Sequence, residues 1–258
     1  MMSSILHDIA KLVRSRERSL PQGFDRGEEI GRGADGSPTC AIDKVAEDVI
    51  LDYVESNDLP YNVLSEEAGW VDRGKDRTLV VDPIDGTYNA IMGIPFYSVS
   101  LAIGNRSLLG VEEGLVQNLV TGDIYYAKKG RGATFNGEPI HTRKFDSRRS
   151  VFLVYLGKYS SASNFNFAKR GMRARAMGCA SLEMCILAQG RADAFFMDCE
   201  VYERSIRVVD IAASALILRE AGGEILDMND RPLDMEFDLK ARSNFIAYGD
   251  EELRRWVM

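Results

Sequence analysis

The stretch Thr78-Leu79-Val80-Val81-Asp82-Pro83-Ile84-Asp85-Gly86-Thr87 (residues 78–87) joins a short β-branched run to an acidic turn. The run predicts a buried strand that delivers Asp82 at its carboxyl end, where Pro83 stops the ladder because it lacks an N–H. Two carboxylates with a carbonyl between them are typical of a Mg²⁺ site. The N–H groups of Gly86 and Thr87, at the expected start of a helix, favour an anion. The alternative is a strand-end turn in which Asp and Gly serve only turn chemistry.

Four further acidic residues, at three places in the chain, extend this pattern. Glu66 and Glu67 follow another short apolar run, residues 61–64, and ligands gather at the carboxyl ends of strands in α/β sheets. Asp210 lies near the start of an apolar helix pattern, and Asp43 lies early in another. The alternatives are solvated glutamates on an exposed loop and first-turn acids that interact with the helix dipole.

Hydrophobic periodicity predicts an α/β protein with an α+β first half, residues 1–140, and an α/β second half, residues 141–258. The first half is expected to carry metal and phosphate, and the second half the substrate side. Helices are expected over 5–13, 42–54, 161–170, 180–189 and 208–221. Strands are expected over 61–64, 78–81, 96–104, 108–118, 151–156, 173–177, 192–198, 223–227 and 244–248. Residues 121–135 predict a hairpin, and the glycine-rich residues 27–38 predict a mobile loop.

Composition restricts the classes of function. The 258 residues carry a formal net charge of -7, which disfavours binding to nucleic acid or anionic membranes. We expect no membrane span, because the longest uncharged apolar run near the C-terminus, residues 211–218, is too short. The chain has only two histidines, His7 and His141, which disfavours a mechanism that uses a histidine as general base. Four cysteines without a Cys-x-x-Cys pair indicate a reducing compartment, so a cytoplasmic location is expected.

The acidic positions fall into the motifs of a known family. The chain resembles the inositol monophosphatase superfamily, Mg²⁺-dependent phosphatases that include archaeal enzymes acting on both inositol monophosphate and fructose 1,6-bisphosphate. The resemblance covers about residues 35–248 and rests on four segments: the first signature at 82–87, the second at 209–213 running on to 220–223, the glutamate element at 65–67 and the sugar-site segment at 178–185.

The resemblance implies a layered αβαβα sandwich, a homodimer, and two or three Mg²⁺ ions in each active site. By position, the metal ligands are Glu66, Asp82, Asp85, Asp210 and the Ile84 carbonyl. Asp43 resembles the acid near a third metal and the attacking water, and Thr87 resembles the residue that orients or deprotonates that water. Glu66, with Asp43 and Thr87, belongs to the expected catalytic set. No histidine and no phosphoenzyme are needed.

The substrate-binding residues implied by the same resemblance lie in three groups. Gly86 and Thr87 would hold the phosphate through backbone N–H groups, with Asp85 and Asp210 as further substrate-binding residues. Gly178, Cys179 and Ala180 would line the sugar side. Glu203 lies where inositol-specific members bind ring hydroxyls. Arg204 and Arg175 are candidates for a second phosphate, and the alternative for each arginine is a surface charge.

We therefore expect a Mg²⁺-dependent phosphate monoester hydrolase that attacks inositol 1-phosphate and fructose 1,6-bisphosphate with a metal-activated water. Its partner is expected to be a small phosphorylated sugar or polyol. The alternatives are a 3′-phosphoadenosine 5′-phosphate or NADP phosphatase of the same fold, and a non-catalytic regulator that binds metal or phosphate. The sequence leaves open the physiological substrate, the oligomer size, lithium sensitivity and redox control by the cysteines.

Overall fold

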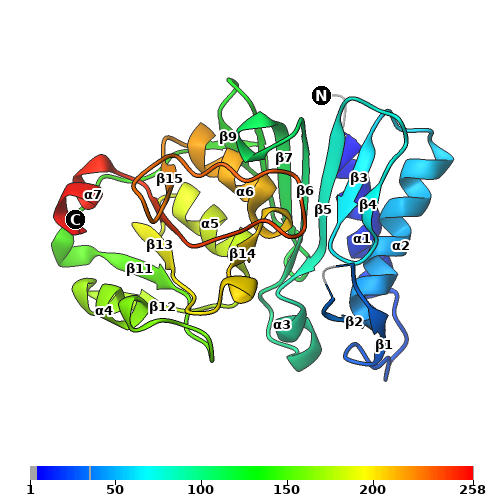
Figure 1. Cartoon of the computed structure of the whole chain (residues 1–258), viewed down its shortest axis with the longest axis horizontal. Coiled ribbons are helices and arrows are strands. Elements are labelled where there is room, and N and C mark those ends of the chain that lie inside the picture. The colour runs from blue at the N-terminus through cyan, green and yellow to red at the C-terminus, as the bar shows by residue number, and fades with distance from the viewer. Residues whose placement is uncertain (1–4, 35, 258) are drawn as a thin grey trace.

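Five layers of secondary structure build the chain in the computed structural model, which describes residues 5–34 and 36–257. In order, they are a helix pair, an eight-stranded sheet, a second helix pair, a five-stranded sheet and an outer layer of helices (Figure 1). The expected αβαβα sandwich is therefore confirmed. None of the helices within these described ranges is long and apolar enough to cross a membrane.

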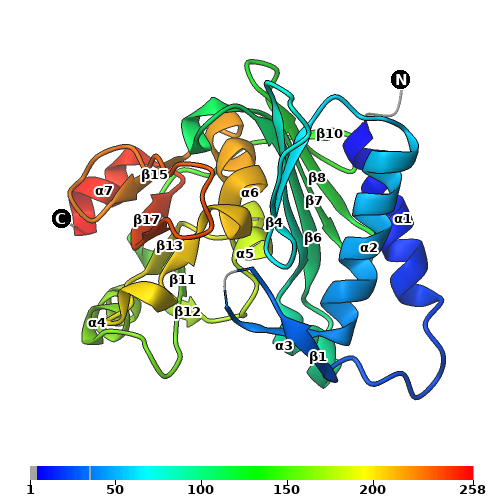
Figure 2. The ribbon, with the colours of Figure 1, turned by 45° about the vertical axis from the view of Figure 1, so that its right-hand side comes forward.

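The eight-stranded sheet has the order β10-β9-β8-β7-β6-β5-β3-β4. One face is covered by helices α1 (Ile5–Arg18) and α2 (Ala41–Ser56), which pack on each other and on the sheet (Figure 2). The strands are β3 (Asn62–Ser65), β4 (Gly69–Val71), β5 (Thr78–Asp85), β6 (Ser98–Gly104), β7 (Val111–Asn118), β8 (Ile124–Lys128), β9 (Ala133–Phe135) and β10 (Glu138–Ile140).

Strands β3 and β5 pair in parallel, and their register places two acids together. Ser65 pairs with Val81, so the next residues along each strand, Glu66 and Asp82, lie at the same sheet edge. The prediction that strand β5 ends before Pro83 was wrong. The strand continues to Asp85, and its pairing with β6 is instead irregular between Asp82 and Asp85, where proline has no N–H to donate.

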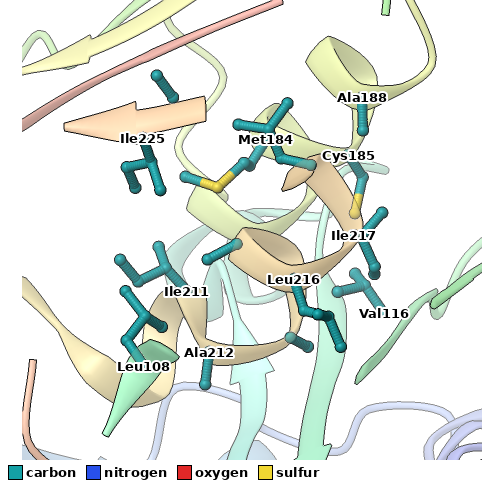
Figure 3. Packing of buried hydrophobic residues seen from close by; sticks show 14 of the residues in the cluster. Leu108, Val116, Met184, Cys185, Ala188, Ile211, Ala212, Leu216, Ile217 and Ile225 are labelled. Atoms are coloured by element: carbon teal, nitrogen blue, oxygen red, sulfur yellow. The ribbon is translucent and has the colours of Figure 1, made fainter. Parts of the chain in front are cut away.

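Helices α5 (Ala180–Ala188) and α6 (Val208–Glu220) form the central layer between the two sheets. Every residue of α6 from 208 to 218 is buried. A helix that is apolar all round belongs in a core, and Figure 3 shows Ile211, Leu216 and Ile217 packed among side chains from several other elements. The expected helix over 208–221 is confirmed, and its N-terminus lies where Glu66 and Asp82 emerge.

The five-stranded sheet has the order β12-β11-β13-β17-β15. Its strands are β11 (Val151–Val154), β12 (Arg173–Arg175), β13 (Ala194–Met197), β15 (Glu224–Asp227) and β17 (Phe245–Tyr248). Helices α4 (Ala162–Arg170) and α7 (Glu251–Val257) cover its outer face, where the rings of Phe152, Phe167 and Phe196 stack in sequence.

Some short elements depart from the sequence-based expectation. Residues 27–38, predicted as a mobile loop, contribute strand β1 (Glu29–Arg32), which pairs with β2 (Pro38–Cys40). Asp35 lies outside the described residues. The first three residues of the expected strand 108–118 form a 3-10 turn. Helix α3 (Thr87–Met92) is six residues long and begins directly after Gly86. Strand β14 (Ile206–Arg207) directly precedes α6 and pairs with β16 (Arg242–Ser243).

Candidate active site

Three carboxylates from three different elements meet at the end of the central layer. Glu66 follows β3, Asp82 lies in β5, and Asp210 lies in the first turn of α6. One oxygen from each of these side chains lies within 4.8 Å of the others. Residues far apart in the sequence thus converge because the helix α6 begins beside Glu66 and Asp82, which the parallel pair β3–β5 brings together.

Asp82 provides a test of whether this cluster fits a metal ion. The residue is 1% exposed, and its Oδ1 atom is buried without a hydrogen-bond partner among residues 5–34 and 36–257. Burial, followed by the charges of Glu66 and Asp85, raises the pKa of Asp82 well above its usual value. An unpartnered buried carboxylate oxygen is costly unless a cation pairs with it. A set of hard oxygen donors fits a divalent cation such as Mg²⁺.

Arg207 lies against two of these carboxylates, and the sequence analysis did not assign it to the site. Its Nη1 donates to Glu66 Oε1, and its Nη2 donates to Asp210 Oδ1 at 2.7 Å. Burial raises the pKa of Glu66 to about 8, while the nearby Arg207 charge opposes that rise. A sequence signal existed: Arg207 precedes Asp210 by three residues at a helix start, a spacing at which the two side chains meet.

Asp85 has donors on the other side of the site. Its carboxylate accepts the backbone N–H groups of Ser181 at 2.6 Å and Ala180 at 3.3 Å, and the Cys179 thiol at 3.1 Å. Burial raises the pKa of Asp85, and the hydrogen bond from Ser181 opposes that rise. Asp85 therefore anchors the N-terminus of α5 beside the cluster, and it is absent from the group of three oxygens within 4.8 Å.

Asp43 and Thr87 form a hydrogen-bonded pair between α2 and α3. The Thr87 hydroxyl lies 2.9 Å from Asp43 Oδ1 and 2.9 Å from the Ile84 carbonyl oxygen. It carries a single hydrogen, so it donates to one of them at a time. Burial raises the pKa of Asp43 to about 7, and the hydrogen bond from Thr87 opposes that rise.

Gly86 and Gly178 bring two backbone segments into close contact. Both adopt positive φ, 84° and 75° respectively. A β-carbon on Gly86 would lie 3.1 Å from Cys179 Cβ and 3.2 Å from the Gly178 carbonyl oxygen. The turn before α3 and the turn before α5 therefore meet without room for a side chain at Gly86.

The other expected substrate residues lie farther out. Glu203 and Arg204 are exposed, in a 3-10 turn over Tyr202–Arg204, and Arg204 lies over the ring of Tyr159 at 5.2 Å. Arg175 is exposed on edge strand β12, where Nη1 donates to the Ala174 carbonyl at 2.7 Å. Within the described residues, no hydrogen bond or ion pair joins these three side chains to the carboxylate cluster.

Glu203 and Arg204 line a cavity of about 910 Å³. Two exposed aromatic side chains, Trp70 and Tyr202, contribute to its wall. Cationic side chains come from four positions, Arg32, Arg204, Lys240 and Arg242. The cavity extends from the β1–β2 hairpin to the segment before β17.

A buried acid supports the turn that carries Glu66. Glu47 in α2 accepts the Ser65 hydroxyl at 2.6 Å and the Ala68 N–H at 2.8 Å, both through Oε1. Glu47 was not among the predicted site residues, although its position among the apolar residues of the buried face of α2 was the available signal.

Residues 5–255 match the inositol monophosphatase family. The chain is 38% identical over 250 residues to a fructose-1,6-bisphosphatase/inositol-1-monophosphatase of Methanothermobacter thermautotrophicus, with 91% of this chain and 87% of that protein covered. It is 34% identical to a bifunctional NADP phosphatase/NAD kinase of Methanococcus maripaludis, with 93% of this chain and 46% of that longer protein covered. A solved structure from Pyrococcus horikoshii, described as similar to inositol-1 monophosphatase, superposes with a TM-score of 0.83 at 32% identity. That match covers 97% of this chain and 94% of the other.

Proposed function

The chain belongs to the inositol monophosphatase family and is a phosphatase, and from that premise we propose that it hydrolyses inositol 1-phosphate and fructose 1,6-bisphosphate with Mg²⁺. The single observation that supports this most strongly is the buried convergence of Glu66, Asp82 and Asp210. The substrates are those in the names of several archaeal relatives.

Mg²⁺ would be held by Glu66, Asp82 and Asp210, with Asp85 and the Ile84 carbonyl as further ligands and two or three ions in each site. The unpartnered Asp82 Oδ1 supports this assignment. When bound, the metal supplies neutralisation of the phosphoryl oxygens and activation of water.

The protein's own contribution to water attack is a proton path through Thr87 and Asp43. When the Thr87 hydroxyl takes a proton from the attacking water, its own hydrogen passes to Asp43 Oδ1, 2.9 Å away. A carboxyl group with a pKa of about 7 exchanges that proton near neutral pH. Because the Ile84 carbonyl is the second acceptor for Thr87, the hydroxyl is held in place in both orientations.

The substrate is proposed to lie between the turns before α3 and α5. The N–H groups of Gly86 and Thr87 would hold the phosphate, and Gly178, Cys179 and Ala180 would border the sugar or polyol. Asp85, which already binds the turn before α5, links the phosphate side to the sugar side.

We propose that substrate preference is determined by Glu203, Arg204 and Arg175. Their exposure supports contact with the distal part of a bound molecule. Replacing Glu203 with glutamine should alter the preference between inositol 1-phosphate and fructose 1,6-bisphosphate more than the common hydrolytic step.

The test is phosphate release from inositol 1-phosphate, fructose 1,6-bisphosphate, 3′-phosphoadenosine 5′-phosphate and NADP, each with Mg²⁺ and with a chelator. We expect Mg²⁺-dependent release from the first two. Release that persists in chelator, or no release from any of the four, would contradict the proposal.

The cavity of about 910 Å³ favours a second candidate, an NADP phosphatase. Trp70 and Tyr202, 50% and 60% exposed, offer rings on which a base can stack, and the surrounding cations offer charge for a pyrophosphate. Two relatives carry NADP phosphatase in their names. A preference for NADP in the same panel would support this candidate over the sugar phosphatase.

We also propose that the protein forms a homodimer in the cytoplasm. Each chain would consist of a metal-binding half, residues 1–140, and a substrate-side half, residues 141–258. Exposed apolar side chains on and after α3, namely Tyr88, Met92 and Ile94, support a second copy as partner. Four free cysteines support a reducing compartment. Light scattering of the purified protein tests the dimer.

A further inference from the structure

Arg207 joins Asp210, three residues away, to Glu66, which is 141 residues from Arg207 in the sequence. It caps helix α6, and its side chain is 19% exposed. Nη1 donates to Glu66 Oε1, while Nη2 and Nε donate to Asp210 Oδ1 at 2.7 and 3.0 Å. The Arg207 backbone N–H also donates to Asp210 Oδ2 at 2.8 Å. One guanidinium therefore binds both acids through several charge-assisted hydrogen bonds.

The same two acids belong to the three-carboxylate cluster. A divalent cation held there would bind the same two carboxylates, of which Arg207 engages Oε1 of Glu66 and both oxygens of Asp210. The two contacts of Arg207 differ in how far they constrain it. The Asp210 contacts lie within one helical turn, and one of them is a backbone bond, whereas the Glu66 contact spans from α6 to the end of β3.

We propose that Arg207 is a built-in competitor of the metal ion and that it sets the metal affinity of the site. In the metal-free protein its guanidinium neutralises Glu66 and Asp210. When the metal binds, the guanidinium releases Glu66, while the backbone bond to Asp210 keeps that carboxylate oriented. The inference rests on the proposed metal site. It adds that the metal must displace Arg207 from Glu66, which weakens metal binding.

The proposal has two linked consequences. Removing the guanidinium leaves two partly buried carboxylates without their cation, so the metal-free protein loses stability. The metal then binds without displacing a competitor, so its dissociation constant falls. Coupling between two binding events typically changes an affinity by about 5- to 150-fold, and we expect the loss of Arg207 to change the Mg²⁺ affinity by a factor in this range.

A purely structural role predicts a different pattern. If Arg207 only pins α6 to the end of β3, its loss lowers stability and leaves metal affinity unchanged or weaker. Arg219 provides a matched control, because it lies on the same helix, its side chain is 18% exposed, and it pairs with Glu224 at 3.0 Å.

The experiment uses the full-length protein and its Arg207→Met, Arg207→Lys and Arg219→Met variants. Mg²⁺ binding is measured by calorimetry, and the melting temperature is measured in chelator and in saturating Mg²⁺. Arg207→Met should bind Mg²⁺ about 5- to 150-fold more tightly and show a larger rise of melting temperature with Mg²⁺. Arg219→Met should melt lower in both conditions with an unchanged dissociation constant.

Arg207→Lys covers the case in which the methionine variant fails to fold. Lysine keeps the charge but loses the planar fork that binds two acids, so it should bind Mg²⁺ more tightly than the wild type. A dissociation constant that is unchanged or higher in the folded Arg207 variants would overturn the inference and leave the phosphatase assignment intact. If neither the wild type nor any variant bound Mg²⁺, the proposed metal site itself would fail.

Discussion

Glu47 gives the most quantitative prediction about how the fold holds its site. This acid is 3% exposed, and its Oε1 atom accepts two hydrogen bonds, from the Ser65 hydroxyl at 2.6 Å and the Ala68 N–H at 2.8 Å. These bonds fix both ends of the turn that carries Glu66. The decisive perturbation is Glu47→Ala, with Glu47→Gln as its control, because glutamine keeps an oxygen that can accept both bonds.

The magnitude follows from the two donors that alanine leaves behind. The Ser65 hydroxyl is fully buried and costs about 1–3 kcal/mol without an acceptor, whereas Ala68 is exposed and its N–H can bind water, so Glu47→Ala should lower the free energy of unfolding by about 1–3 kcal/mol. Glu47→Gln keeps an acceptor oxygen at the same place and should lose no more than about 1.5 kcal/mol. The alanine variant should also bind Mg²⁺ more weakly, because Glu66 is no longer held at the end of β3.

Urea unfolding in the presence of chelator, followed by circular dichroism, measures the free energy of unfolding without metal. Calorimetry measures the Mg²⁺ affinity separately. A loss below about 1 kcal/mol in Glu47→Ala, or an equal loss in both variants, would refute the argument from unsatisfied donors.

Two further predictions concern the turn that precedes α3. Gly86→Ala places a β-carbon 3.1 Å from Cys179 Cβ at a φ of 84°, so urea unfolding should show a loss of about 1–3 kcal/mol, exceeding that of Gly130→Ala. Gly130 has a φ of 72° and nothing within 4 Å, which isolates the backbone cost; equal losses would count against close packing. Thr87→Ala should lower kcat by about 10²–10⁴-fold because Asp43 loses its proton path, whereas Thr87→Ser should stay within about tenfold. An alanine variant as active as the serine variant would exclude the hydroxyl from the reaction.

Sequence patterns predicted the elements in which apolar residues form a clear stripe or a continuous run. The helix over 208–221 was recognisable because apolar residues fill its whole length, and a helix buried on all sides needs them. The convergence of Glu66 and Asp82 followed from two strands that each end in an acid. The family signature then provided the layer order, which composition and period alone left open.

Two features escaped sequence reasoning because they depend on contacts between distant segments. Arg207 meets Glu66 only after β3 and α6 have been brought together, so the local pattern around residue 207 indicates no more than its pairing with Asp210. Pro83 was expected to end its strand, since proline lacks an N–H. The neighbouring strand tolerates the missing bond through an irregularity in register, and β5 therefore reaches Asp85.

The glycine-rich segment 27–38 illustrates the limit of composition as a guide. Glycine and charge favour a loop, yet Gly31 pairs with Thr39 in a short hairpin that leads into α2. Within that hairpin, Thr39 donates to Glu67, next to the cluster residue Glu66. Tertiary contacts of this kind override local propensity in short strands.

The central claim is that Glu66, Asp82 and Asp210 hold a metal ion that phosphate hydrolysis requires. The most direct measurement pairs Mg²⁺ calorimetry with phosphate release for the wild type and Asp82→Asn. Because Asp82 is buried with an unpartnered oxygen, its neutral replacement should leave the chelated protein at least as stable as the wild type.

We predict that Asp82→Asn binds Mg²⁺ much more weakly and releases phosphate at least about 100-fold more slowly, since about 3 kcal/mol of transition-state stabilisation corresponds to that factor. A folded Asp82→Asn protein with wild-type Mg²⁺ affinity and wild-type turnover would contradict the metal assignment.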